Sequence, residues 1–200
     1  MDGPTLALSL LAASLTALVL YAAYVYNKLV GLSLLVKNAL SQIDVQLSRR
    51  HNLIPNLVAV TQGYLAHERG VLESVTRARA EASRLLASRP EYDDAVGVTA
   101  LSSAETELTA SLARLLVVME AYPELKGAQH TGRLMEELAS AENRVAFARQ
   151  HYNDSAMRYN TLRESFPAMF VAGAFGFTGA AYLEFADRSI EIPFDVGLNE

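Results

Sequence analysis

The chain has 200 residues with 17 basic and 22 acidic side chains, and its formal net charge of -5 argues against a general nucleic-acid binder, which needs a dominant basic surface. The absence of cysteine excludes disulfide frameworks, thiolate metal sites, iron–sulfur clusters and cysteine nucleophiles. A hydrophobic content of 51% is high for a soluble domain, and the excess lies at the two ends of the chain.

An uncharged apolar segment follows the N-terminus. Between Asp2 and Lys28 lie 25 residues without a charged side chain. Crossing a bilayer core of about 30 Å takes about 20 apolar helical residues, and this segment supplies them. A cleaved signal peptide is the competing interpretation, but the segment lacks both a basic start and an Ala-x-Ala site. We therefore predict an uncleaved transmembrane anchor over residues 1–27.

The charges that flank this segment predict its orientation. Only Asp2 precedes it, whereas Lys28 and Lys37 follow it closely. Positive residues near a span favour the cytoplasmic side. We expect a single-pass protein of the inner (plasma) membrane, with its N-terminus outside and its body in the cytoplasm.

Helical periodicity dominates the next part of the chain. From Asn27 to Ser88, apolar residues recur at spacings of three and four along one heptad stripe, a pattern typical of coiled coils and bundles. This pattern predicts a single long helix that leaves the membrane. Pro55 removes a backbone donor, so we expect a kink near residues 52–54, and Pro90 ends the helix.

Two further amphipathic helices are predicted downstream. Asp93 or Asp94 can cap a helix that runs to about Ala121, and another helix should span about Thr131 to Phe166. Helices of this kind bury their apolar stripes against one another. We therefore predict an all-α fold, in which the transmembrane helix continues into an antiparallel bundle of long amphipathic helices over residues 28–166.

The C-terminal region, residues 167–200, is Gly-rich and apolar and ends in a short acidic tail. Residues 165–183 carry no charge but include Pro167 and three glycines, which weaken a helix. A second membrane span is one alternative. We favour an irregular segment that lies at the membrane interface or packs on the bundle. The tail from Asp187 onward is expected to be loosely ordered.

Several motifs in this chain are specific in combination. They are Tyr26–Val30, Ser41–Val58, Leu115–Pro123, Glu142–Val145, Ala148–Asn153, Tyr159–Asn160, Ser165–Pro167 and Gly173–Phe177. Together these motifs resemble the LemA family of bacterial membrane-anchored proteins over about residues 24–185. The resemblance implies a single N-terminal span and a helical-bundle body, and it implies no enzymatic activity. The family that it indicates includes a divergent member associated with forming an intracellular organelle membrane.

Arg50 interrupts the apolar stripe and is the first candidate site residue. A buried guanidinium without a partner costs several kcal/mol, so a facing helix should supply Glu105, Glu120 or Glu142. One interpretation is a polar hub that binds a ligand or a partner, and the other is an ion pair that fixes helix register. We favour the second interpretation. Glu68 also lies on the stripe, and for it we weigh the same two interpretations and again favour an ion pair that fixes helix register.

A repeated Tyr-Asn pair is the second candidate site. Tyr152-Asn153 and Tyr159-Asn160 are seven residues apart, so both pairs lie on one helix face. They form either a recognition face for another helix or hydrogen bonds inside the bundle. We favour the bundle, because tyrosine commonly buries its ring while its hydroxyl finds a partner.

Signatures of chemistry are missing from the sequence. No histidine follows a glutamate by three residues, as a carboxylate-bridged di-iron bundle requires, and His67-Glu68 lacks the second histidine of a zinc motif. There is no Gly-x-Ser-x-Gly turn and no phosphate-binding glycine loop. We expect no metal, no cofactor and no catalytic residue.

Two functions remain compatible with these patterns. The first is a non-enzymatic, membrane-anchored helical scaffold or adaptor that contacts lipid through its span and another membrane or membrane-associated protein through its bundle. The second is a membrane organiser that acts through the apolar C-terminal segment and self-association. The heptad stripes make a homo-oligomer plausible.

Overall fold

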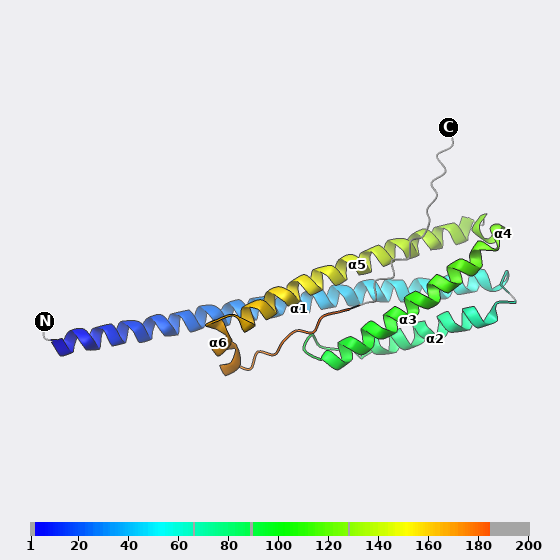
Figure 1. The fold of residues 1–200 in the computed structure, drawn as a ribbon. Coiled ribbons are helices and arrows are strands. Elements are labelled where there is room, and N and C mark those ends of the chain that lie inside the picture. The colour runs from blue at the N-terminus through cyan, green and yellow to red at the C-terminus, as the bar shows by residue number, and fades with distance from the viewer. Residues whose placement is uncertain (1–2, 66, 89, 128, 185–200) are drawn as a thin grey trace, which may run out of the picture.

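A helix of 60 residues, α1 (Gly3–Gln62), runs along the whole molecule (Figure 1). The structure, a computed structural model, describes residues 3–65, 67–88, 90–127 and 129–184. The N-terminal part of α1 projects alone, and its C-terminal part is covered by the other helices (Figure 1). One continuous helix therefore links the predicted anchor to the bundle.

The free part of α1 has the features of a membrane span. Residues 4–21 are all exposed, and α1 is the one described helix that is long and apolar enough to cross a membrane. The hydroxyls of Ser9, Ser14 and Thr16 donate to carbonyls one turn earlier in the same helix. Such bonds satisfy polar side chains where water is absent.

The predicted single helix from Asn27 to Ser88 is wrong. α1 continues through Pro55 but ends at Gln62, and α2 (Arg69–Ala87) runs back along it. The stripe conceals this reversal because Tyr64, inside the turn, keeps the heptad spacing between Leu57 and Val71 although it is 46% exposed. Glu68 consequently lies at the N-cap of α2 and not on a helix face.

The remaining bundle helices match their predicted ranges to within about two residues. α3 spans Ala95–Glu120, and the Asp94 carboxylate caps it by accepting from the Gly97 N–H at 2.9 Å. A short helix, α4 (Pro123–Gly127), leads into α5 (Gln129–Glu164). α1 packs against α5 and α2, and α2 packs against α3. The all-α antiparallel bundle is confirmed.

The bundle contains two apolar cores that follow one another along its axis. The proximal core, nearer the free part of α1, includes Leu29, Ile43 and Tyr152. The distal core includes Leu57, Leu108 and Leu112. Arg50 and Glu105 occupy sequence positions between the two cores on α1 and α3, so a polar layer divides the apolar interior.

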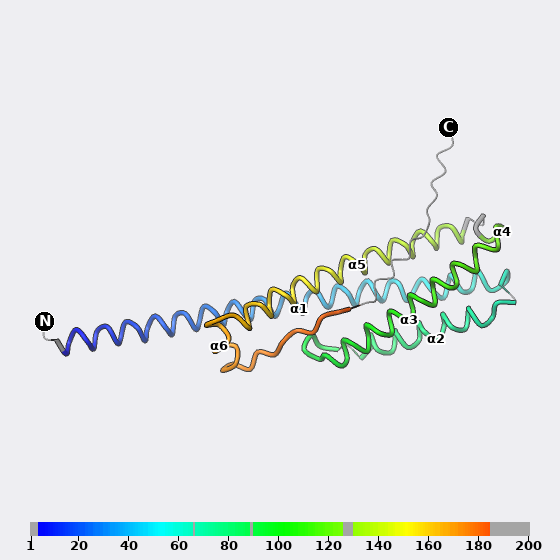
Figure 2. The backbone as a smooth tube through the Cα atoms, in the orientation of Figure 1, coloured from blue at the N-terminus to red at the C-terminus, as the bar shows by residue number. Residues whose placement is uncertain are grey.

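The C-terminal region does not form a second span within the described residues. It contains a seven-residue helix, α6 (Ala168–Ala174), which is followed by Phe175 at the C-cap and by Gly176 with a φ of 69°. The Phe177 N–H donates to the Ala172 carbonyl and the Gly176 N–H to the Gly173 carbonyl, which is a Schellman ending that glycine accommodates. Beyond it, residues 178–184, hereafter the strap, run extended along the bundle (Figure 2). The acidic tail predicted from Asp187 lies outside the described residues.

Candidate functional site

Four ionisable side chains from three helices meet between the two apolar cores. This polar layer consists of Arg50 and His51 of α1, Glu105 of α3 and Glu142 of α5. Arg50, His51 and Glu105 are at most 3% exposed, whereas 25% of the Glu142 side chain is exposed. Burial of this kind is tolerated only where charges are paired and hydrogen-bonded.

Arg50 joins α1 to two other helices, α3 and α5. Its Nη1 donates to Glu105 Oε2 at 3.0 Å, and its Nη2 donates to Thr109 Oγ1 at 2.7 Å. On the other side, Nε lies 2.6 Å from Glu142 Oε1, an ion pair without the alignment of a hydrogen bond. One guanidinium thus holds α3 and α5 in register with α1.

His51 extends the layer to α2. Its Nε2 lies 2.8 Å from Glu105 Oε1, and its Nδ1 lies 3.0 Å from the Ser83 hydroxyl. Since an ionised carboxylate only accepts hydrogen bonds, Nε2 carries a proton toward Glu105. The His51 carbonyl accepts from Arg79 Nε at 3.1 Å, and it is free to do so because Pro55, four residues later, has no N–H.

Burial changes the ionisation of Glu142. Desolvation raises the pKa of its carboxyl group above the usual range, and the neighbouring Glu105 adds to the rise, while Arg50 opposes it. Two carboxylates thus share one arginine in a poorly solvated place. Protonation of Glu142 would therefore change the charge balance of the layer.

The structure brings together only part of the first predicted set. Arg50, Glu105 and Glu142 meet, but Glu120 lies exposed in the last turn of α3, 15 residues and roughly 22 Å of helix beyond Glu105. Sequence reasoning also missed His51, because it was considered only as a metal ligand. The signal available was Pro55, whose missing donor leaves a carbonyl at His51 to be satisfied by another helix.

The Tyr-Asn pairs of α5 hold the strap, which belongs to the same chain. The Asn153 amide exchanges two 3.0 Å hydrogen bonds with the backbone of Leu183, and the Asn160 amide exchanges two 2.9 Å hydrogen bonds with that of Ala180. The hydroxyls of Tyr152 and Tyr159 donate at 2.7 Å to the carbonyls of residues 181 and 178. We call these four side chains the clamp.

The spacing of the clamp matches the geometry of an extended strap. Seven residues of α-helix rise about 10.5 Å, and three residues of extended chain span about 10 Å. The two asparagines are seven residues apart, and the residues they bind are three apart. The partner is therefore neither a helix of another protein nor a helix of the bundle, the two alternatives that the sequence left open.

The opposite edge of the strap is bound by the α2–α3 connection and by α3. The Ala181 N–H donates to the Tyr92 carbonyl, the Thr178 hydroxyl donates to the Asp93 carboxylate, and the Ser102 hydroxyl donates to the Glu184 carbonyl. Burial raises the pKa of both clamp tyrosines to about 12, so their hydroxyls remain donors. The strap is consequently held from both sides by hydrogen bonds, most of which run between its main chain and side chains of the bundle.

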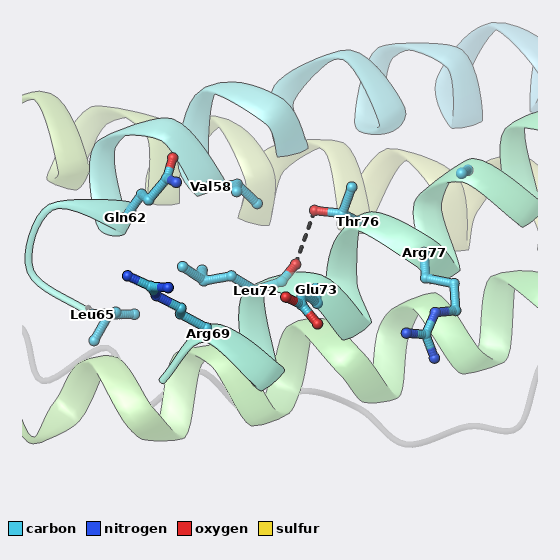
Figure 3. Close-up of a pocket in the computed structure, with 9 residues that line it drawn as sticks. Val58, Gln62, Leu65, Arg69, Leu72, Glu73, Thr76 and Arg77 are labelled. Carbon is cyan, nitrogen blue, oxygen red and sulfur yellow. Dashed lines mark hydrogen bonds between the residues drawn. The ribbon is translucent and has the colours of Figure 1, made fainter. Parts of the chain in front are cut away.

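A groove lies at the distal end of the bundle, between the end of α1 and the start of α2 (Figure 3). It has a volume of about 930 Å³, and Val58, Leu65 and Leu72 contribute apolar surface to it. Arg69 and Arg77 also line it and project from α2 (Figure 3). Within the described residues, no group of three or more metal-ligating side chains is placed to hold a metal ion.

Comparison with known proteins places the chain in a family. It is 27% identical to two magnetosome proteins of Paramagnetospirillum magneticum, MamQ 1 and MamQ 2, over 175 residues, which are 80% of this chain and 64% of each relative. It is 27% identical to the magnetosome protein MamQ of Magnetospirillum gryphiswaldense over 71% of this chain and 58% of that protein. The chain thus spans less than two thirds of these relatives.

The sequence model of the LemA family matches residues 39–196, which include every residue of the polar layer and of the clamp. The match covers well over half of the chain, and it agrees with the motifs that first indicated this resemblance. The chain therefore belongs to the LemA family.

Proposed function

We propose that the protein is a membrane-anchored, non-enzymatic scaffold or adaptor of the LemA type. The observation that carries this proposal is α1, whose exposed apolar half continues without a break into the bundle. We place the anchor in the inner membrane as a single pass, with the N-terminus outside and the bundle in the cytoplasm. Lys28 and Lys37, just after the span, support this orientation.

The polar layer supports a structural role more than a catalytic one. Its buried ionisable groups bind one another, as helix-register devices do, with Arg50 joining Glu105 and Glu142. The clamp likewise binds the protein's own strap. These groups are engaged in holding helices and strap together, which a presenting scaffold requires.

The distal groove is the surface we propose for a protein partner. Its apolar residues lie beside Arg69 and Arg77, a combination that suits an amphipathic segment with acidic residues (Figure 3). The groove is at the end of the bundle farthest from the span, where a cytoplasmic or membrane-associated protein can reach it (Figure 1).

Topology is tested first, with single cysteines in this cysteine-free chain. Ser88→Cys and Gly3→Cys are probed in intact cells with a thiol reagent that does not cross the membrane. We expect labelling at position 3 and protection at position 88. Labelling at position 88 alone would overturn the orientation.

The adaptor role is tested by photo-crosslinking in cells. A photoreactive residue replaces Thr76, which lines the distal groove, and a matched control replaces Val117, exposed on α3 outside it. We expect a reproducible protein adduct from position 76 that position 117 does not give. Adducts to lipid or to a second copy alone would contradict the adaptor role.

A second candidate function is organisation of the membrane by self-association and by the apolar C-terminal segment. The observation that favours it is the outer face of α1 and α5, where the exposed Val45 and Phe147 flank a groove of about 590 Å³. The relatives named magnetosome proteins are consistent with a role at a membrane. Oxidation of Phe147→Cys in membranes should then give a covalent dimer, whereas Val96→Cys, exposed elsewhere, should not.

A further inference from the structure

Large apolar side chains gather without cover on α6 and at its two ends. Phe166, Met169, Phe170 and Phe175 are 80%, 48%, 64% and 62% exposed, and we call them the α6 patch. The rings of Phe166 and Phe170 contact each other edge to face at 6.0 Å. Residues 165–183 contain no charged side chain. A contiguous apolar surface of this kind on a folded body marks an interaction site.

The α6 patch lies beside the end of the exposed apolar part of α1. The Phe175 ring packs on Tyr26 with centroids 4.9 Å apart, and Phe177 packs on the same tyrosine at 5.6 Å. α1 contacts α6, and Val25, Leu29, Ala168 and Ala172 belong to the same core cluster. The position of α6 along α1 is therefore fixed by packing.

The helix rise converts this contact into a depth in the membrane. If about 20 residues cross the hydrocarbon and the last is Tyr24, then Tyr26 lies about 3 Å beyond the hydrocarbon edge. The headgroup layer extends roughly 5–7 Å on each side of the hydrocarbon, so Phe175 falls within it. Lys28 follows, with its ammonium 5.8 Å from the Tyr24 ring centroid, as cations at a membrane boundary do.

We propose that the α6 patch is a second membrane-binding site, which inserts into the headgroup layer of the leaflet from which α1 emerges. The inference rests on the proposed anchoring of α1 and deepens it, because two contacts fix the depth and rotation of the bundle where one span leaves both free. The partner is the lipid surface itself, since the patch is continuous with a span that requires lipid.

Interfacial insertion fits the geometry better than the alternatives. With seven residues, α6 is far too short to cross about 30 Å of hydrocarbon. The clamp holds the chain immediately after it on α5, so residues 178–184 remain with the bundle. Phenylalanine and methionine side chains bind a lipid boundary through apolar burial.

The absence of tryptophan allows a direct measurement of depth. The full chain is reconstituted in phospholipid vesicles with one tryptophan at a time: Phe170→Trp in the α6 patch, Leu15→Trp in the exposed part of α1, and Val117→Trp on α3 of the bundle as a matched control. All three positions are exposed, so the substitutions disturb little packing. Quenching is compared for lipids spin-labelled near the headgroup and near the chain end.

We expect Phe170→Trp to show blue-shifted emission and stronger quenching by the shallow label. Leu15→Trp should show stronger quenching by the deep label, and Val117→Trp should show neither the blue shift nor the quenching. Phe166→Trp, at the most exposed position of the patch, provides an independent reporter with the same expected result. If both patch reporters behave like the bundle control, or are quenched from the deep position like Leu15→Trp, the inference is overturned. Loss of quenching at Leu15→Trp would instead contradict the anchoring on which it rests.

Discussion

The polar layer and the clamp solve the same problem, the burial of polar groups, in opposite ways. The layer gathers charged side chains of α1, α3 and α5, which satisfy one another. The clamp uses neutral side chains of α5 to satisfy the backbone of an extended segment. The comparison shows that α5 carries both devices: Glu142 fixes its register with α1, and its Tyr-Asn pairs fix the chain that returns along it.

The two devices should differ in what their loss costs. Removing one charge of the layer leaves its partners buried and unpaired, which is far more expensive than losing neutral hydrogen bonds. Loss of a clamp residue frees an edge segment, and the helices still bury both apolar cores. We therefore expect global destabilisation from the layer and local opening from the clamp.

Arg50→Met should give the largest effect. The substitution keeps an apolar stem but leaves Glu105 and Glu142 without their cation, and breaking a buried pair typically costs about 3–5 kcal/mol. The free energy of unfolding, measured by circular dichroism in detergent, should fall by that order. Arg84→Met is the control, because its ion pair with Glu81 is exposed and should contribute little. Equal stability of the two variants would contradict a stabilising role for Arg50.

A compensated variant sharpens the meaning of that loss. Arg50→Met combined with Glu105→Gln and Glu142→Leu removes the charges together, while the new amide at position 105 keeps an acceptor for His51. Replacing a buried ionic cluster by apolar groups is often neutral or stabilising, so most of the lost stability should return. If this compensated variant unfolds without cooperativity, the layer specifies helix register. If it stays as unstable as Arg50→Met, unpaired buried charge is not the cause of the stability that Arg50→Met loses.

Asn160→Ala should act on the strap alone. It removes two hydrogen bonds to the Ala180 backbone, each worth about 0.5–1.5 kcal/mol. Hydrogen exchange at residues 178–184 should accelerate about tenfold or more, since about 1.4 kcal/mol is a factor of ten. Exchange in α1 and α3 should stay unchanged. Asn143→Ala, on an exposed face of α5, is the matched control and should leave the strap protected.

Much of the fold follows from local sequence signals. The span is predicted by an uncharged apolar segment, the start of α3 by Asp94 and the ends of helices by prolines. The pairing of Arg50 is predicted by the cost of a lone charge on an apolar stripe, although three glutamates qualified. The position of Glu120 at the far end of α3 could be judged only once the α1–α2 reversal was known.

The reversal and the strap escaped sequence reasoning for different physical reasons. The turn after Gln62 keeps the heptad spacing because Tyr64 lies seven residues after Leu57 and seven before Val71, so periodicity alone does not distinguish a turn from a helix. The strap has no alternating pattern, since its hydrogen bonds go mainly to side chains and not to a neighbouring strand. The sequence signal for the strap lies on α5. Its two Tyr-Asn pairs are seven residues apart, and this helical rise matches three residues of an extended chain.

The smallest effect we predict is a difference in pH dependence. Because burial raises the pKa of Glu142, the folded state holds this proton to higher pH than the unfolded state, whose pKa is about 4.3. The stabilisation that this proton supplies is complete below the pKa of Glu142 in the unfolded state. It is lost as pH rises through the pKa of Glu142 in the folded state. Thermal unfolding should show wild type losing stability relative to Glu142→Gln along this rise.

Glu81→Gln is a control with the opposite sign, because the hydrogen bond from Arg84 lowers the pKa of Glu81. As pH rises through the unfolded pKa of Glu81, wild type should gain stability relative to Glu81→Gln. A wild-type to Glu142→Gln difference that is constant with pH would show that the pKa of Glu142 is the same in the folded and unfolded states, which contradicts the prediction.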